Sequence, residues 1–205
     1  MIFNCVLAGV GGQGIVLASK LIAQAAMNRG LFVRTAETIG MAQRGGCVVS
    51  HVRVGEEIFS SMVPKGEADL ILGFEPAEAV RCLPYLKPGG AVVASAKAVT
   101  PVTASLSGSV YSGGEMLACL GRLPLKLLVV DGGAVCEECG AARVLNVALL
   151  GAACFSGALP FGLNELETAL RERVASRFVE MNLRALHAGA RAVRLAGDAE
   201  RECLR

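Results

Sequence analysis

Glycines are spaced as Gly-x-Gly-x-x-Gly in residues 9–14 (GVGGQG), which follow an apolar run and precede a helical pattern. With this spacing, Gly9 permits a sharp turn, Gly11 lets an anion or another backbone approach, and Gly14 allows the helix to pack on the strand. Free N–H groups at the start of the helix favour negative charge. The segment therefore predicts either a loop that binds a phosphate or dinucleotide, or a tight turn that serves packing alone.

A dinucleotide site needs an acidic residue at the end of the second strand to bind the ribose hydroxyls. The candidate is Glu37, which lies 23 residues after Gly14, slightly later than the usual distance of about 20 residues. An oxidoreductase that binds NAD(P) or FAD on its own is therefore one open hypothesis.

A second polar segment, residues 37–46 (ETIGMAQRGG), has no regular period. Two consecutive glycines beside a guanidinium are typical of backbone that runs close to a carboxylate or phosphate ligand, or to a partner. The alternative is a surface ion pair between Arg44 and Glu37. Because ligand crevices form at the carboxyl ends of parallel strands, we expect both segments to meet at one rim. The candidate cofactor-binding residues are Gly9, Gly11, Gly12, Gln13, Gly14, Glu37, Gln43, Arg44, Gly45, Gly46 and Ser50.

Groups suited to catalysis or metal binding are sparse. His51 falls in an alternating strand pattern and is expected to be a core histidine, whereas His187 is expected on the surface of a helix. Cys136 and Cys139 form one C-x-x-C pair without a second pair, which favours two incidental thiols over a metal site. We predict no catalytic residue and no metal ligand in this chain.

Hydrophobic periodicity predicts the elements that position these segments. The first half of the chain reads as strand 2–8, helix 15–28, strand 31–36, and a β-hairpin of 47–54 with 58–63. Strand 69–74, helix 75–82, a turn at 87–90 and strand 91–95 follow. After a surface excursion at 99–114 come helix 115–122, strand 125–130, and helices 136–155, 163–175 and 177–195.

This order predicts the α/β class, with an open, mostly parallel, Rossmann-like sheet flanked by helices. The strand, helix, strand unit of residues 2–36 is expected to be a parallel, right-handed crossover. We expect an antiparallel β-hairpin beside the sheet and a helical C-terminal third. Residues 1–205 are read as a single domain, with a sheet-containing core over about 1–135 and a helical part over about 136–196.

The composition excludes several classes of protein. Hydrophobic residues make up 53% of 205 residues, which excludes disorder, and a net charge of +2 gives no basic footprint for nucleic acid. Eight scattered cysteines and no signal-peptide pattern predict a cytoplasmic protein. The uncharged run 144–164 is long enough for a membrane span, but its Gly, Ser, Asn and Pro residues favour a buried helix, so no membrane partner is expected.

Four segments together resemble the gamma-type subunits of 2-oxoacid:ferredoxin oxidoreductases. They are residues 9–26 (GVGGQGIVLASKLIAQAA), 37–46 (ETIGMAQRGG) with 48–53 (VVSHVR), 86–90 (LKPGG) and 143–152 (RVLNVALLGA), within a similarity that runs from 3 to about 193. Many gamma subunits carry Tyr-Gly and an acidic residue before Arg-Gly-Gly, where this chain has Ile39-Gly40-Met41-Ala42-Gln43. In this segment the chain resembles the arylpyruvate branch of the family, which contains the beta subunits of indolepyruvate ferredoxin oxidoreductases.

The resemblance implies a reaction in which a 2-oxoacid such as indolepyruvate is decarboxylated on thiamine diphosphate. Electrons then leave through iron-sulfur clusters to ferredoxin, and coenzyme A takes up the acyl group. Thiamine diphosphate with Mg²⁺ needs a Gly-Asp-Gly segment, and the one Gly-Asp pair here is Gly197-Asp198. Clusters need cysteines in close-set groups of four. The resemblance therefore implies that both cofactors lie on a larger alpha subunit and that this chain is a non-catalytic subunit, inactive alone.

The glycine segment and the Arg44 segment would then shape the edge of an active site on the partner, or bind the phosphates of coenzyme A. A redox-inert adaptor that holds a complex together is a further alternative.

Overall fold

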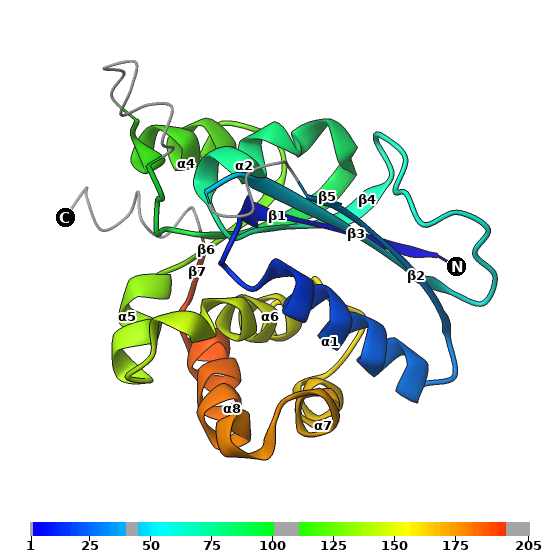
Figure 1. Cartoon of the computed structure of the whole chain (residues 1–205). Helices are drawn as coiled ribbons and strands as arrows, with labels where there is room; N and C mark the ends of the chain where they lie inside the picture. Colours follow the sequence, from blue (N-terminus) through cyan, green and yellow to red (C-terminus); the bar gives the residue numbers. More distant parts are fainter. Residues whose placement is uncertain (1, 40–44, 101–110, 196–205) are drawn as a thin grey trace.

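A seven-stranded mixed sheet forms the centre of the computed structural model, which describes residues 2–39, 45–100 and 111–195 (Figure 1). The strands are β1 (Phe3–Val10), β2 (Phe32–Ile39), β3 (Cys47–Gly55), β4 (Ala68–Gly73), β5 (Leu86–Ser95), β6 (Lys126–Val130) and β7 (Val193–Leu195). Their order across the sheet is β2-β3-β1-β4-β5-β6-β7. β1, β4, β5 and β6 run parallel, whereas β3 and β7 are antiparallel to their neighbours. The predicted open, mostly parallel sheet is therefore confirmed.

Helices cover both faces of this sheet (Figure 1). One face carries α1 (Ile15–Asn28), α5 (Gly132–Glu138), α6 (Leu145–Phe155), α7 (Leu163–Arg173) and α8 (Ser176–Arg191). The other face carries α2 (Pro76–Arg81) and α4 (Gly113–Gly121). Two short 3₁₀ turns, Leu83–Tyr85 and Ala142–Val144, complete the described helical segments.

Side chains of β1 alternate between the two resulting cores. Cys5 and Leu7 belong to the larger core beneath α1 and α6, whereas Val6 and Ala8 belong to the smaller core beneath α2. All four side chains are fully buried. A strand buried on both faces must be apolar throughout, which explains the continuous run at the start of the sequence.

The antiparallel pairing differs from the prediction. β3 pairs with β2 on one side and with β1 on the other, so the predicted hairpin between 47–54 and 58–63 is wrong. β2 runs in the same direction as β1, as predicted for the unit of residues 2–36, but β3 lies between the two strands. The observed hairpin consists of β2 and β3.

Residues 58–63 are held by side chains instead of by a strand ladder. The guanidinium of Arg53 donates to the carbonyl oxygens of Ser60 (3.2 Å) and Met62 (3.5 Å). The imidazole Nδ1 of His51 accepts from the N–H of Val63 (3.3 Å). These side chains satisfy hydrogen-bonding groups of this backbone segment, which in a hairpin would pair with the neighbouring strand.

Three smaller differences concern element ends. Residues 87–90, predicted as a turn, are the start of β5, where the β4–β5 register is irregular. The predicted helix 136–155 is interrupted at Gly140, which has a φ of 65° and separates α5 from the Ala142–Val144 turn that precedes α6. The predicted helix 177–195 ends at Arg191, and β7 follows it. Most of the predicted excursion at 99–114 lies outside the described residues.

The uncharged run 144–164 is divided between α6, a connection and the start of α7. Among the described residues, no helix is both long enough and apolar enough to cross a bilayer.

Helices α6 and α8 approach closely at two glycines. A Cβ on Gly151 of α6 would collide with the backbone carbonyl of Leu186, and a Cβ on Gly189 of α8 would collide with that of Ala148. The two helix backbones are therefore in direct contact, which lets α6 be buried along almost its whole length.

The helix crossing predicts a stability effect. Gly151→Ala should lower the free energy of unfolding by about 1–3 kcal/mol, because the added methyl group must push α8 away. Urea unfolding followed by circular dichroism measures the change. Gly121→Ala, at an open position at the end of α4, is the matched control and should cost nothing. Equal stability of the two variants would contradict the close contact.

Candidate functional site

The glycine loop lies where β1 ends and α1 begins. Gly14, the residue before the helix, has a left-handed backbone with a φ of 77°, and Gly12 has a φ of 100°. The first turn of α1 contains no acidic residue, and no described side chain caps it. The N–H groups at this helix start therefore present a positive end that suits an anion.

Gln13 fixes the shape of the loop. Its Oε1 accepts from the N–H of Val10 (2.7 Å), and its Nε2 donates to the carbonyl oxygen of Phe74 (3.0 Å). The side chain thereby joins the end of β1 to the end of β4. Gln13 was predicted to bind a cofactor, but in the structure both ends of its amide are used within the chain.

Asn146 on α6 also contacts the loop, and it was not selected from the sequence as a functional residue. It is 2% exposed on α6, and its Nδ2 donates to the carbonyl oxygen of Gly14 (3.2 Å). A Cβ on Gly14 would lie 2.5 Å from that Nδ2, so this glycine is required by both its φ and its surroundings. The signal in the sequence was a single amide within the uncharged run 144–164.

The glycine loop and the second polar segment meet. The N–H of Gly11 donates to the carbonyl oxygen of Gly46 (2.8 Å), and Gly45 beside it has a φ of 77°. This contact follows from the antiparallel pairing, because β3 begins at the edge where β1 ends, with Cys47 opposite Val10. Gln43 and Arg44 lie outside the described residues.

Glu37 and Ser50 sit beside one another, next to α1. They are cross-strand partners on β2 and β3. An Oε1 of Glu37 accepts from the hydroxyl of Ser19 on α1 (3.4 Å). Ser50 is fully buried, alternates with core residues Val48 and Val52, and its Oγ has no hydrogen-bond partner among the described residues.

Glu37 does not occupy the position of the acidic residue that binds the ribose in a dinucleotide site. In such sites the acidic residue comes from the strand adjacent to the glycine loop's own strand. Here β3 intervenes, so β2 lies two strand spacings, about 9.6 Å, from β1. This geometry disfavours the dinucleotide hypothesis.

A buried carboxylate lies at the same edge and was not selected from the sequence as a functional residue. Glu75 follows β4 and is 2% exposed. It accepts from the N–H of Glu78 (3.1 Å) at the start of α2 and from the phenol of Tyr111. Burial, together with the hydrogen bond to Glu75, raises the pKa of Tyr111 above its usual range. The pair anchors the segment that leads into α4.

Cys136 also lies near this edge, on α5. Burial raises the pKa of its thiol, while the Lys97 ammonium and the N–H groups of Val144 and Leu145 act in the opposite direction. Cys139 is buried one turn further on, and burial raises the pKa of its thiol too. Among the described residues, no group of three or more His, Cys, Asp or Glu side chains could hold a metal ion.

Both histidines lie where the sequence predicted. His51 is 1% exposed and packs edge-on against Tyr85, with 5.2 Å between ring centroids. His187 is exposed on α8, and its Nε2 lies 3.0 Å from an Oε1 of Glu167. Neither faces the glycine loop.

Comparison with known proteins assigns the family. The family model for pyruvate ferredoxin/flavodoxin oxidoreductases matches residues 4–192. The chain belongs to this family. It is 36% identical to the indolepyruvate oxidoreductase subunit IorB of Thermococcus kodakarensis, over 94% of this chain and 96% of that protein. It is 37% identical to IorB of Archaeoglobus fulgidus, over 92% of this chain and 94% of that protein. It is therefore a subunit of an oxidoreductase complex.

Solved structures share the fold of this family member. The pyruvate oxidoreductase subunit PORC of Thermotoga maritima superposes with a TM-score of 0.68 at 21% identity, covering 94% of this chain and 97% of that one. The 2-oxoglutarate:ferredoxin oxidoreductase of Magnetococcus marinus gives a TM-score of 0.71 at 20% identity. The match covers 93% of this chain but 31% of that longer chain.

His51 predicts how stability varies with pH. Burial lowers the pKa of His51 below its ordinary value of 6.5, so the unfolded chain binds a proton more readily than the folded chain. The free energy of unfolding should therefore be highest above about pH 6.5 and should fall as the pH drops below it. Urea unfolding between pH 5 and pH 8 measures this slope. His51→Gln should flatten it, whereas the control His187→Gln should not; equal slopes would contradict the assignment.

Proposed function

We propose that this chain is the non-catalytic subunit of a ferredoxin-dependent oxidoreductase that decarboxylates indolepyruvate or other arylpyruvates to acyl-coenzyme A. A larger subunit would carry thiamine diphosphate, Mg²⁺ and the iron-sulfur clusters, which supply the decarboxylation and the electron transfer. The observation that carries the proposal is the joined rim of Gly11 and Gly46 in a chain that is 36–37% identical to IorB subunits.

The rim would line the edge of the partner's active site. The uncapped start of α1 and the exposed Gly12 offer backbone N–H groups, and Arg44 would add a guanidinium. Together these groups suit a carboxylate or the phosphates of coenzyme A. Gln13 and Asn146 hold the loop in place, so its donors are oriented before any ligand arrives.

The arylpyruvate assignment rests on the relatives and on one segment. The IorB subunits are 35–37% identical, whereas the common gamma subunits of pyruvate/ketoisovalerate oxidoreductases are 24–28% identical. Ile39-Gly40-Met41-Ala42-Gln43 stands where many gamma subunits carry Tyr-Gly and an acidic residue.

Purification from the native host under oxygen-free conditions tests this function. The tagged chain should carry with it one larger subunit, iron and thiamine diphosphate. The complex should reduce an artificial electron acceptor with indolepyruvate and coenzyme A, faster than with pyruvate. The chain purified alone should be inactive. Recovery of the chain without a partner but with bound NAD(P) or flavin would overturn the proposal in favour of a separate dinucleotide-binding oxidoreductase.

Gly12 offers a test of the rim itself. Gly12 and Gly30 flank α1, both have left-handed backbones with open space around them, and a valine at either costs about 1–2 kcal/mol of strain. Gly12→Val should additionally lower the activity of the assembled complex by about tenfold or more, because its side chain occupies the approach to the loop. Gly30→Val is the control for strain. Equal activity of the two complexes would show that the loop faces neither ligand nor partner.

A further inference from the structure

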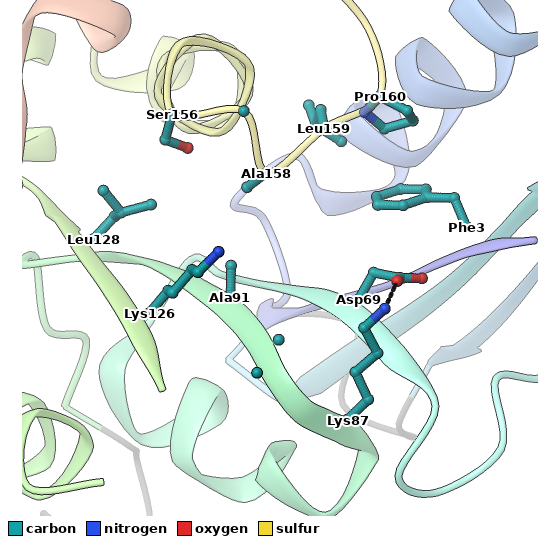
Figure 2. Close-up of a pocket in the computed structure, with 13 residues that line it drawn as sticks. Phe3, Asp69, Lys87, Ala91, Lys126, Leu128, Ser156, Ala158, Leu159 and Pro160 are labelled. Carbon is teal, nitrogen blue, oxygen red and sulfur yellow. Dashed lines mark hydrogen bonds and ion pairs between the residues drawn. The ribbon is translucent and has the colours of Figure 1, made fainter. Parts of the chain in front are cut away.

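A cavity opens at the edge of the sheet opposite the glycine loop. It has a volume of about 300 Å³ and lies between the amino ends of the parallel strands and the connection from α6 to α7 (Figure 2). Phe3 at the start of β1, Leu128 on β6 and Leu159 on the connection are among the residues that line it. The volume is at the lower end of the range of about 300–1,000 Å³ that small-molecule sites occupy.

A break in the sheet ladder creates the space. Between the pairs Ala68–Leu86 and Leu70–Ala91, β5 has four intervening residues where β4 has one. Gly89, with a φ of 74°, and Gly90 lie in this irregular stretch and contribute no side chain. On the opposite wall Ala158 is also small. The irregular backbone of β5 and the small residues on both walls together leave the space open.

The lining of the cavity combines polar and apolar groups, and it carries an exposed positive charge. Figure 2 shows the side chain of Lys126 extending from β6 into the space between the sheet and the α6–α7 connection. Lys126 has no ion pair or hydrogen bond with any described residue, and it is exposed. Lys87, by contrast, is paired with Asp69.

Both oxygens of the Asp69 carboxylate have partners within the chain. One oxygen binds Lys87, and the other accepts from the N–H of Asn4 (2.7 Å). Asp69 is thus paired with Lys87 and not with Lys126, and the described groups that line the cavity leave one positive charge uncompensated. A ligand that matches this arrangement has one negative charge and an apolar body.

We infer that this cavity is a binding site for a small organic monoanion, a carboxylate on a compact apolar body. The carboxylate would bind the ammonium of Lys126, and the apolar body would lie against Phe3, Leu128 and Leu159. The site lies at the other edge of the sheet from the rim of Gly11 and Gly46, so it is separate from the proposed function. Ligand binding to this site can therefore be measured on the full chain without an activity assay.

Three probes test the match of charge and shape. Isothermal titration of the full chain should show saturable binding of benzoate. Benzamide, which has the same shape without the charge, should bind about tenfold more weakly or worse. Acetate, which has the charge without the apolar body, should show the same loss. Equal affinity of benzamide, or of acetate, would overturn the inference, as would the absence of saturable benzoate binding.

Two variants test whether the ligand binds in this cavity. Lys126→Met keeps the length of the side chain, removes the charge, and should weaken benzoate binding by about tenfold. Lys20→Met, at an exposed lysine of α1 away from the cavity, is the control and should leave binding unchanged. Amide chemical shifts should move on benzoate addition at Phe3, Leu128 and Leu159. Unchanged affinity in Lys126→Met, or shifts confined to the glycine loop, would place the ligand elsewhere and refute the inference.

Discussion

The hydrogen bond from the N–H of Gly11 to the carbonyl oxygen of Gly46 is the constraint on which the candidate site depends. It can form because β3 runs antiparallel beside β1, so that the start of one strand adjoins the end of the other. A parallel neighbour in the place of β3 would begin at the opposite edge of the sheet. The insertion of β3 therefore brings together two segments that lie about thirty residues apart in the chain, and it also moves Glu37 away from the glycine loop.

Groups from the rigid core hold the glycine loop, and this limits what the loop can do. Gln13 and Asn146 direct their amides toward backbone atoms, and Glu75 is engaged with the start of α2 and with Tyr111. Among the described residues, no histidine reaches the loop to move a proton. What the loop offers is the uncapped start of α1, a set of fixed donors. Fixed donors of this kind can orient an anionic ligand without first having to reorganise.

Local patterns in the sequence were sufficient to predict most helices and strands, because the pattern of apolar residues in a segment reflects which of its side chains are buried. Residues 15–28 alternate with helical period and form α1 with the predicted bounds, and the apolar run at the N-terminus forms β1. The hairpin was predicted wrongly because a second short apolar run, residues 58–63, closely follows strand 47–54 in the sequence. In the structure β3 pairs with β1 and β2, and residues 60–63 contact the side chains of Arg53 and His51, which no period reveals. The contact of Asn146 with Gly14 spans 132 positions and was likewise invisible. The meeting of the two glycine-containing segments was predictable, because both follow strands that end at one edge.

The apolar composition of the chain has an internal explanation. The mean hydropathy of +0.53 suggests a large interface, yet α6 alone contributes ten buried residues and packs backbone to backbone against α8. Such a central helix needs apolar residues on every side, whether or not a partner is present. The large exposed apolar side chains, by contrast, are distributed over separate elements, with Phe32 on β2, Phe59 after β3 and Phe155 at the end of α6. Composition therefore carries little of the case for a partner subunit, and that case rests on the family and on the rim of Gly11 and Gly46.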